Sequence, residues 1–428
     1  MKKTSPPYLI IALLILSGEA IFLLPFVLPR VFRPTFLEVF QINNFELGAA
    51  FSIYGIVAMA SYFFGGIIAD RFRPRKLMAV ALIMTALGGF ALSSYPSLSV
   101  LNLVYGYWGC TTILLFWAAM IKATREWGGD QKQGKAFGFL DGGRGLVGAL
   151  MGVVGVYIFS LFMTEDVENV TGDERREAFR QVILFTSFLI IVVALMVWRW
   201  LKTGTEESSA TNNADNKLSI DSVMTVVKIP TVWLLMVIIL CGYVGYKITD
   251  VFSLYAKEVM LYNEVDAAKV GTLLLFVRPV TGITFGVIAD RTRSSLWVTI
   301  GFVIMFFGAL LFASGILGPG LYALFFISLI ATCIGVYSIR ALYFAVLHEG
   351  HIPLALTGTA VGLVSLVGYT PDIFVGPITG YLLDSSPGEP GHQHVFIMLA
   401  IFSAVGFIAS VAFQRYAKKK AKEATEVA

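Results

Sequence analysis

The stretch "FGFLDGGRGLVGALMGVVGVYIFS", residues 137–160, is long and apolar enough to cross a membrane. A helix of about 20 mostly apolar residues spans the hydrocarbon core of a bilayer. The same stretch carries Asp141 and Arg144 near its start, although a charge at the centre of a membrane helix costs about 2.5–3.5 kcal/mol. It therefore predicts a membrane helix whose charged side chains face a protein interior or a wet cavity.

The rest of the chain repeats this apolar character. Of its 428 residues, 57% are hydrophobic and 14% charged, with a mean hydropathy of +0.77, whereas soluble domains are about 45–50% apolar and 25% charged. A helix satisfies its own backbone polar groups in lipid. We predict an all-α membrane protein with twelve transmembrane helices, at 8–29, 46–68, 77–95, 98–121, 136–162, 180–201, 229–254, 267–289, 296–317, 320–343, 355–383 and 393–415.

The basic residues predict the orientation. With both termini in the cytoplasm, the inner segments and their flanks hold 21 of the 32 lysines and arginines, and the outer loops hold 7. Positive charge favours the cytoplasmic side. The net charge of +4 is explained by this bias and by the basic tail, so it indicates no nucleic-acid partner.

Internal repeats predict two like halves. "GGIIADRFRPRK" at 65–76 recurs as "FGVIADRTRSSL" at 285–296, and "GKAFG" at 134–138 recurs as "GTAVG" at 358–362. The polar stretch 202–228 separates them and is typical of a linker. We predict a six-helix bundle at 1–201, a cytoplasmic linker at 202–228, a second six-helix bundle at 229–417 and a cytoplasmic tail at 418–428. Such repeats form a cavity near the bilayer midplane.

The repeated loops carry a family resemblance. The chain resembles the major facilitator superfamily of secondary transporters through the residues of these loops, namely Gly66, Asp70, Arg71, Arg75 and Lys76 in the first copy and Gly286, Asp290 and Arg291 in the second. An acid at such a loop can meet basic residues or a helix N-terminus. We expect these residues to form a conformational gate at the cytoplasmic end; a plain basic anchor is the alternative.

Eight ionisable residues fall inside the predicted helices. They are Glu19, Asp141, Asp250 and Asp372, against Arg144, Lys247, Arg278 and Arg340. If unpaired and central they would cost roughly 20–28 kcal/mol together, so they must face the interior and pair. Spacing predicts that Asp141 pairs with Arg144, and that Lys247 pairs with Asp250 near the outer interface.

Arginine suits bidentate recognition of carboxylate, phosphate or sulfonate. The predicted substrate-binding residues are Arg144, Arg278 and Arg340, with Tyr337, Trp117 and Tyr105 lining a pocket. For each arginine the alternative is a structural ion pair, and for the aromatic residues of the fourth helix it is helix packing.

No histidine lies within a predicted helix, so a proton relay would use the carboxylates Glu19, Asp141 or Asp372. A salt bridge to a neighbouring arginine is the alternative for Glu19. The glycines and prolines around Pro371 predict a kinked eleventh helix.

The chain is also similar to bacterial inner-membrane facilitators associated with sulfonated sugars, which resemble the organophosphate antiporter branch. The matching stretches include "GKAFGFLDGGRG", "IRALYFA" and "LVGYTPDIF". This resemblance implies a monomeric inner-membrane transporter of a small organic anion that works by alternating access, proton-coupled or by antiport.

The residues also leave two other functions open. One is a proton-driven exporter of cationic or amphipathic compounds, and the other is a lipid translocator or non-transporting receptor. The sequence has no P-loop, no Cys/His metal spacing and no nucleophile with a base. We therefore expect no enzyme activity, no catalytic residue, no cofactor and no metal. The expected partners are the lipid bilayer, a small-molecule substrate and protons.

Overall fold

The computed structural model describes residues 7–128, 133–163, 171–202, 220–343, 345–350 and 357–427. Within this part of the chain, twelve helices are long and apolar enough to span a membrane, and no residue lies in a β-strand. The predicted all-α fold with twelve spans is confirmed. Residues 203–219 of the predicted linker lie outside the described residues, and the end of that linker forms a short helix, α10 (Ile220–Val227).

The chain forms two compact units that do not follow chain order. Unit 1 comprises Met1–Asn213 and Asp250–Pro279, and unit 2 comprises Ala214–Thr249 and Val280–Ala428. The contacts therefore group the segment 250–279 with unit 1, although it lies in the predicted second half. One boundary falls at a helix irregularity and the other at Pro279, inside a helix.

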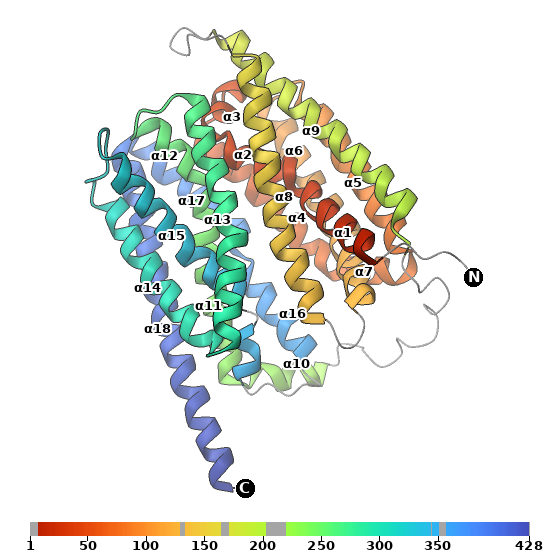
Figure 1. Ribbon diagram of the computed structural model, residues 1–428, viewed down its shortest axis with the longest axis vertical. Helices are drawn as coiled ribbons and strands as arrows, with labels where there is room; N and C mark the ends of the chain where they lie inside the picture. The colour runs from red at the N-terminus through yellow and green to blue at the C-terminus, as the bar shows by residue number, and fades with distance from the viewer. Residues whose placement is uncertain are drawn as a thin grey trace. The chain divides into compact units, whose positions relative to one another are not determined.

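Unit 1 contains the first six spans (Figure 1). Its helical segments are α1 (Pro7–Phe22), η1 (Leu23–Val27), α2 (Leu28–Val31), α3 (Arg33–Phe40), α4 (Asn44–Arg71), α5 (Pro74–Leu92), α6 (Leu98–Gly109), η2 (Cys110–Trp117), α7 (Ala118–Gly128), α8 (Gln133–Leu161), α9 (Gly172–Trp200) and α12 (Phe252–Glu258), with α13 (Glu264–Asp290) as far as Pro279.

Local sequence signals explain where several of these helices begin. Asn43 and Glu46 form a reciprocal capping box at the start of α4, and Thr171 and Glu174 do the same for α9. Such a box satisfies two backbone N–H groups that a helix start leaves without partners. Pro74 begins α5, where a missing N–H costs nothing.

Two membrane spans of unit 1 contain π-helical turns. In the first span, η1 interrupts the helix around Pro25, and in the fourth span η2 covers the eight residues from Cys110 to Trp117. π-Helical turns are rare and occur frequently at functional sites. These two turns place aromatic side chains at the site described below.

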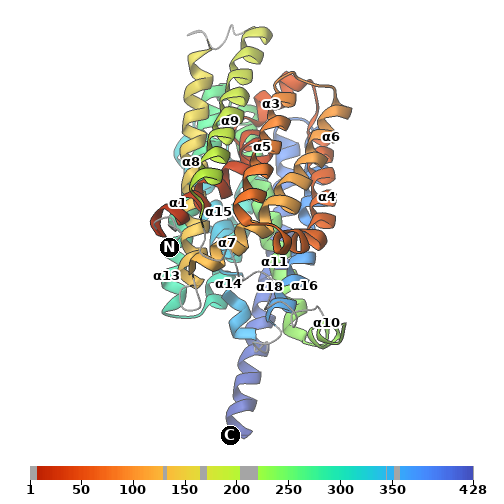
Figure 2. The same cartoon turned by 90° about the vertical axis from the view of Figure 1, so that its right-hand side faces the viewer.

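Unit 2 contains α10, α11 (Pro230–Ile248), the end of α13, α14 (Ser294–Ala313), α15 (Tyr322–Leu342), η5 (Ala345–Gly350), α16 (Thr357–Gly368), α17 (Pro371–Ser385) and α18 (Glu389–Val427). The last helix, α18, is the longest of the described helices (Figure 2), and it ends at Val427, shortly after its candidate membrane span ends at Lys420. The seventh span is broken by a 3-10 turn, η4 (Thr249–Val251). The eleventh is divided into α16 and α17 before Pro371, which confirms the predicted kink.

A continuous apolar core holds unit 1 together. It includes Leu24, Phe32, Phe36, Trp108 and Phe179, all at most 2% exposed. Ala268 and Leu275 of the segment 250–279 belong to the same core, which is why this segment groups with unit 1. We call the end of unit 1 that carries α3, the start of α9 and Glu264 its outer end, after the predicted orientation; α3 and the start of α9 lie together in Figure 2.

Candidate functional site

Glu19 and Arg144 form an ion pair in the interior of unit 1. The Nε of Arg144 on α8 lies 3.3 Å from Oε2 of Glu19 on α1, and both side chains are at least nine-tenths buried. This contact is longer than the 2.7–2.9 Å of a strong charge-assisted hydrogen bond. The sequence left two roles open for Glu19, a proton carrier or a salt bridge to a neighbouring arginine. The contact with Arg144 is a salt bridge of the second kind.

Two glycines make room for this pair. A Cβ on Gly18 would lie 3.1 Å from Cδ of Arg144, and a Cβ on Gly148 would lie 2.8 Å from Oε1 of Glu19. Both helices thus lack a side chain where the partner's charged side chain crosses. A larger residue at either position would force the carboxylate or the guanidinium to move.

Aromatic rings flank the guanidinium of Arg144. Its Cζ lies 5.3 Å from the ring centroid of Phe22 and 5.6 Å from that of Trp117. The two rings meet edge to face, with centroids 6.2 Å apart. Phe22 immediately precedes η1 and Trp117 ends η2. The two π-helical turns therefore adjoin a cation–π box around one buried arginine.

Asp141 and Arg278 form a second and tighter pair in unit 1. The Nη2 of Arg278 donates to Oδ1 of Asp141 at 2.7 Å, with the arginine side chain 7% exposed and the aspartate side chain 53% exposed. Pro279 and Arg278 also lie against Gly145 of α8. The distance is that of a full charge-assisted hydrogen bond.

Asp141 and Arg144, which spacing pairs with each other, each contact a residue of another helix; their pairing with each other stays a prediction. Residues three apart on a helix share a side but point about 60° apart. On α8 that angle is enough for Arg144 to reach α1 and for Asp141 to reach α13. Each charge therefore has a partner on another helix, which sequence spacing alone does not reveal.

Unit 2 holds a pair between Lys247 and Asp372. The Nζ of Lys247 on α11 lies 3.3 Å from Oδ1 of Asp372 in the first turn of α17. The hydroxyl of Tyr243 donates to both carboxylate oxygens at 3.1 Å. A helix N-terminus favours a carboxylate, so the break between α16 and α17 gives this aspartate a favourable position at the start of α17.

Arg340 lies among tyrosines of unit 2. Its Cζ is 3.7 Å from the ring centroid of Tyr246 and 5.6 Å from that of Tyr243. Tyr337, one turn before Arg340, lies edge-on to Tyr246 with centroids 6.5 Å apart. The tyrosines in or next to this group are Tyr243, Tyr246, Tyr337, Tyr343 and Tyr369. The tyrosine cluster combines a cation, aromatic faces and several hydroxyl groups.

Lys247 and Asp250, which spacing also pairs, each contact a residue of another helix; their pairing with each other stays a prediction. Lys247 contacts Asp372, whereas Asp250 accepts from Nε of Arg30 at 2.5 Å. Asp250 lies in the 3-10 turn η4, which directs its side chain differently from a regular helix. Arg30, which the sequence assigns to a loop, is only 3% exposed. The apolar residues on both sides of it, "VLPRVF", are the signal that it lies inside the span.

Tyr105 occupies the core of unit 1. It is fully buried, with its ring edge-on to Phe51 and Trp108 at 5.4 and 5.2 Å. Trp108 is fixed in turn by a hydrogen bond to the carbonyl of Thr85. The packing alternative therefore accounts for the surroundings of this part of the fourth span, in contrast to Trp117 at its other end.

The predicted gate residues lie at helix ends in each unit. Asp70 and Asp290 stand at the ends of α4 and α13, but their side chains lie outside the described residues; Arg71 and Arg291 are exposed and Arg75 is half-buried. A Cβ on Gly66 or Gly286 would meet nothing within 4 Å. Both lie within helices rather than in a turn, so they are not needed there to make the turn.

Neighbouring contacts support the two loops from within. In unit 1, Nζ of Lys122 donates to the carbonyl of Ala69, just before Asp70. In unit 2, Glu349 accepts from the backbone N–H of Ser295 at the start of α14. The carboxylate at that helix start is favoured by the helix dipole.

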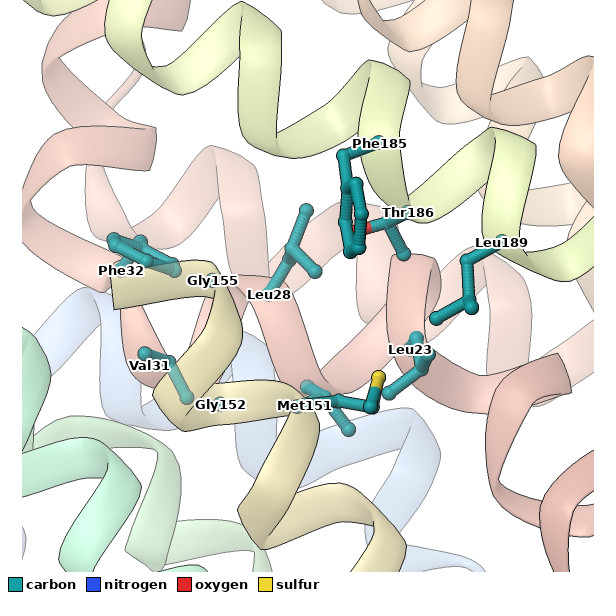
Figure 3. A pocket seen from close by; sticks show the side chains of 11 residues that line it. Leu23, Leu28, Val31, Phe32, Met151, Gly152, Gly155, Phe185, Thr186 and Leu189 are labelled. Atoms are coloured by element: carbon teal, nitrogen blue, oxygen red, sulfur yellow. The ribbon is translucent and has the colours of Figure 1, made fainter. Parts of the chain in front are cut away.

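Figure 3 shows a pocket of a different kind in unit 1. It lies among η1, α2, α8 and α9, and its lining is apolar except for Thr186, whose hydroxyl donates to the carbonyl of Val182. The residues lining it are Leu23, Val27, Leu28, Val31, Phe32, Met151, Gly152, Gly155, Phe185, Thr186 and Leu189. No charged group lines it, so it does not suit an ionic ligand.

Twelve apolar spans with paired charges buried among them define a multi-pass membrane transporter. The chain belongs to the Major Facilitator Superfamily: a sequence model of that family matches residues 9–374. It is thus a secondary transporter, and it carries a small molecule across a lipid bilayer.

Individual proteins support this membership. The chain is similar to inner membrane protein YqcE of Escherichia coli (strain K12), with 27% identity over 402 residues and 91% of both chains covered. It is also similar to inner membrane protein YihN of the same strain, with 26% identity over 428 residues and 98% of both covered.

Solved structures share the fold. A bacterial homolog of the human lysosomal transporter Spinster, inward-facing and occupied, matches with a TM-score of 0.74 and 15% identity, covering 97% of this chain and 98% of that one. The nucleoside transporter NupG matches with a TM-score of 0.70 and 16% identity, covering 95% and 99%. At these identities the likeness establishes the fold alone.

Proposed function

We propose that this transporter carries a small organic anion of the sugar phosphate, sulfonate or carboxylate class, and that the anion binds Arg144. The observation that carries the proposal is the box around this arginine: a carboxylate at 3.3 Å and two aromatic rings within 6 Å. The rings hold the guanidinium in place, and a substrate anion that makes a shorter contact would replace Glu19 as its acceptor.

The pair also suggests how a proton would be coupled to the anion. When a substrate anion replaces Glu19 as the partner of Arg144, the freed carboxylate stays buried, where an isolated negative charge is costly. Uptake of a proton by Glu19 removes that charge. One monovalent anion and one proton then enter together, and the net charge of the site is unchanged. Glu19 is the proton-linked group in this mechanism, in preference to Asp141 and Asp372.

The other basic residues have supporting roles in the proposal. Arg278 is held by Asp141 at 2.7 Å, which favours a structural tie between α13 and α8. Lys247 is held in the same way by Asp372. In unit 2, Arg340 and its tyrosines offer a cation with hydroxyl donors, which suits an anion that also carries hydroxyl groups.

A ligand screen followed by transport tests the proposal. Purified protein is screened by thermal shift against sugar phosphates, sulfonates, dicarboxylates and organic cations, because a bound ligand stabilises the folded state. We expect stabilisation by an anion, its loss in Arg144→Gln, and no change in Lys269→Gln, which removes an exposed cation of the same unit. Stabilisation by cations that survives Arg144→Gln would favour the exporter alternative instead.

Transport in proteoliposomes tests the coupling. In Glu19→Gln we expect anion exchange to continue while accumulation driven by a pH gradient disappears, since the amide cannot carry a proton. Accumulation that persists in Glu19→Gln would show that another group carries the proton or that the carrier is an antiporter.

The orientation is a further part of the proposal. We infer that both termini lie in the cytoplasm, because the basic flank of α18 contains Arg415, Lys418, Lys419 and Lys420. A cysteine introduced at Lys420 in cells should resist a membrane-impermeant thiol reagent until the membrane is broken.

A further inference from the structure

The segment 250–279 is attached to unit 1 by charged side chains at the outer end. It comprises Asp250 and Val251 of η4, the helix α12 and the first part of α13, and it packs against the rest of unit 1 although both of its chain neighbours belong to unit 2. α12 lies against α3, and Figure 1 shows the two close together.

The inner part of this attachment is the pair of Arg30 and Asp250. The Nε of Arg30 donates to Oδ1 of Asp250 at 2.5 Å, and the side chains are 3% and 6% exposed. The hydroxyl of Ser253 donates to the carbonyl of Arg30 at 2.8 Å. A buried pair that is broken on one side leaves a charge without water, so this contact resists opening strongly.

The outer part is a cluster of four charges centred on Glu264. Oε1 of Glu264 lies 2.6 Å from Nε of Arg175 and 3.1 Å from Nζ of Lys257. Glu38 of α3 contacts the same two basic groups, at 2.5 and 3.3 Å. Glu264 is 5% exposed at its side chain, whereas Lys257 and Glu38 are 33% and 46% exposed. Two carboxylates thus share two cations that come from α9 and α12.

The backbone between these charges fits closely. A Cβ on Gly271 of α13 would lie 3.0 Å from Cα of Val31 and 3.2 Å from the carbonyl oxygen of Arg30. Thr272, the next residue, would contact a Cβ on Gly152 of α8 at 3.1 Å. The pair of Arg30 and Asp250 therefore adjoins a close helix-to-helix seam, which excludes larger side chains.

We propose that six residues, Arg30, Glu38, Arg175, Asp250, Lys257 and Glu264, form an outer latch that holds the segment 250–279 on unit 1 and must open once in each transport cycle. Three cations face three carboxylates, so the closed latch is neutral. Opening it separates the three pairs that join the segment to the rest of unit 1, which are Arg30–Asp250, Arg175–Glu264 and Lys257–Glu38. The η4 turn and Pro279 bound the segment at its two ends, where the helical hydrogen bonding is weakest. The latch requires a transporter, but it is independent of the charge of the substrate.

Thiol accessibility tests the latch without a substrate. The native cysteines Cys110, Cys241 and Cys333 are replaced, and Thr272→Cys places a reporter on the face of the segment that packs against α8, at a position that is 5% exposed. Purified protein in detergent is treated with a charged maleimide. We expect Arg30→Gln and Asp250→Asn to raise the labelling rate about tenfold, the change that about 1.4 kcal/mol in the opening equilibrium produces.

Two further variants make the result specific. Lys269→Gln removes an exposed ion pair within the same segment, between Lys269 and Asp266, and should leave the labelling rate unchanged. The exchanged pair, Arg30→Asp with Asp250→Arg, should return labelling toward the parent rate. Labelling that stays at the parent rate in folded Arg30→Gln and Asp250→Asn would overturn the latch. If those two variants do not fold, Lys257→Gln and Arg175→Gln decide by the same measurement.

Discussion

Lys247 and Asp250 are three residues apart, yet they belong to different compact units and contact different helices. Lys247 contacts Asp372 of α17, and Asp250 contacts Arg30 of α2. Asp250 lies in the 3-10 turn η4, and within this turn the seventh span passes from unit 2 to unit 1. A span held from both sides of a break can bend there more easily than a regular helix can.

For the pair of Lys247 and Asp372, removing one partner should cost more stability than replacing both partners. Removing one partner of a buried pair costs about 3–5 kcal/mol, whereas replacing both with apolar residues is often neutral. We expect Asp372→Asn to lower the melting temperature clearly and Lys247→Met with Asp372→Leu to recover much of it. The exposed pair gives the control, because Asp266→Asn should cost about 0–1 kcal/mol. A double variant less stable than Asp372→Asn would contradict this account.

The rings of Phe22 and Trp117 should strengthen substrate binding, because they hold the guanidinium of Arg144 in place. A cation–π contact contributes about 0.5–2 kcal/mol, depending on how far it is desolvated. We expect Trp117→Leu to weaken substrate binding by about 2- to 30-fold on that basis, measured as the ligand concentration for half-maximal thermal shift. Trp198 is half exposed on α9 and supplies the control, since Trp198→Leu should leave binding unchanged. Equal losses in both variants would indicate a general effect of losing an indole.

The tyrosine cluster around Arg340 gives a prediction in unit 2. The ring of Tyr246, rather than its hydroxyl, faces the guanidinium at 3.7 Å. We expect Tyr246→Phe to transport at a rate near that of the parent and Tyr246→Leu to lose about 1–2 kcal/mol of stability. Thermal melting together with uptake in proteoliposomes measures both. If Tyr246→Phe were as impaired as Tyr246→Leu, the hydroxyl of Tyr246 and not its ring would be the important group.

Tyr95, which lies between the third and fourth spans, should make the stability of the folded protein depend on pH. Burial raises the pKa of its phenol above the ordinary value of about 10, and the hydroxyl donates to the carbonyl of Arg176. Because the unfolded chain loses this proton at a lower pH than the folded protein, stability should fall as the pH rises above 10. In Tyr95→Phe that part of the decline should vanish, as melting temperatures between pH 9 and 11 would show; an identical decline would contradict the assignment.

The spans were predictable because a membrane helix needs a long apolar run, and each run is visible in the sequence. The kink before Pro371 was predictable for a similar reason, since proline acts on its own helix. The partners of the buried charged side chains could not be predicted from the sequence. Spacing along α8 shows that Asp141 and Arg144 are near each other, but which helix each one faces depends on packing that no local pattern encodes.

Arg30 illustrates the same limit at a helix end. A basic residue next to Pro29 near the end of an apolar run is usually assigned to a loop, and the orientation count treats it so. In the structure the first span continues to Val31, and Arg30 is buried by its contact with Asp250, 220 residues away. Only the apolar residues that follow it, Val31 and Phe32, hinted at this.

The wide turn η2 has a consequence for how this protein tolerates changes in length. A π-helical turn accommodates an extra residue that a regular α-helix would not, so deleting one residue between Cys110 and Phe116 would allow the fourth span to become regular. The two flanks of η2 would then keep nearly the same relative orientation, whereas a deletion in the regular helix α6 would rotate everything beyond it by about 100°. The indole of Trp117 would therefore stay close to the guanidinium of Arg144 after a deletion inside η2, and would turn away from it after a deletion inside α6.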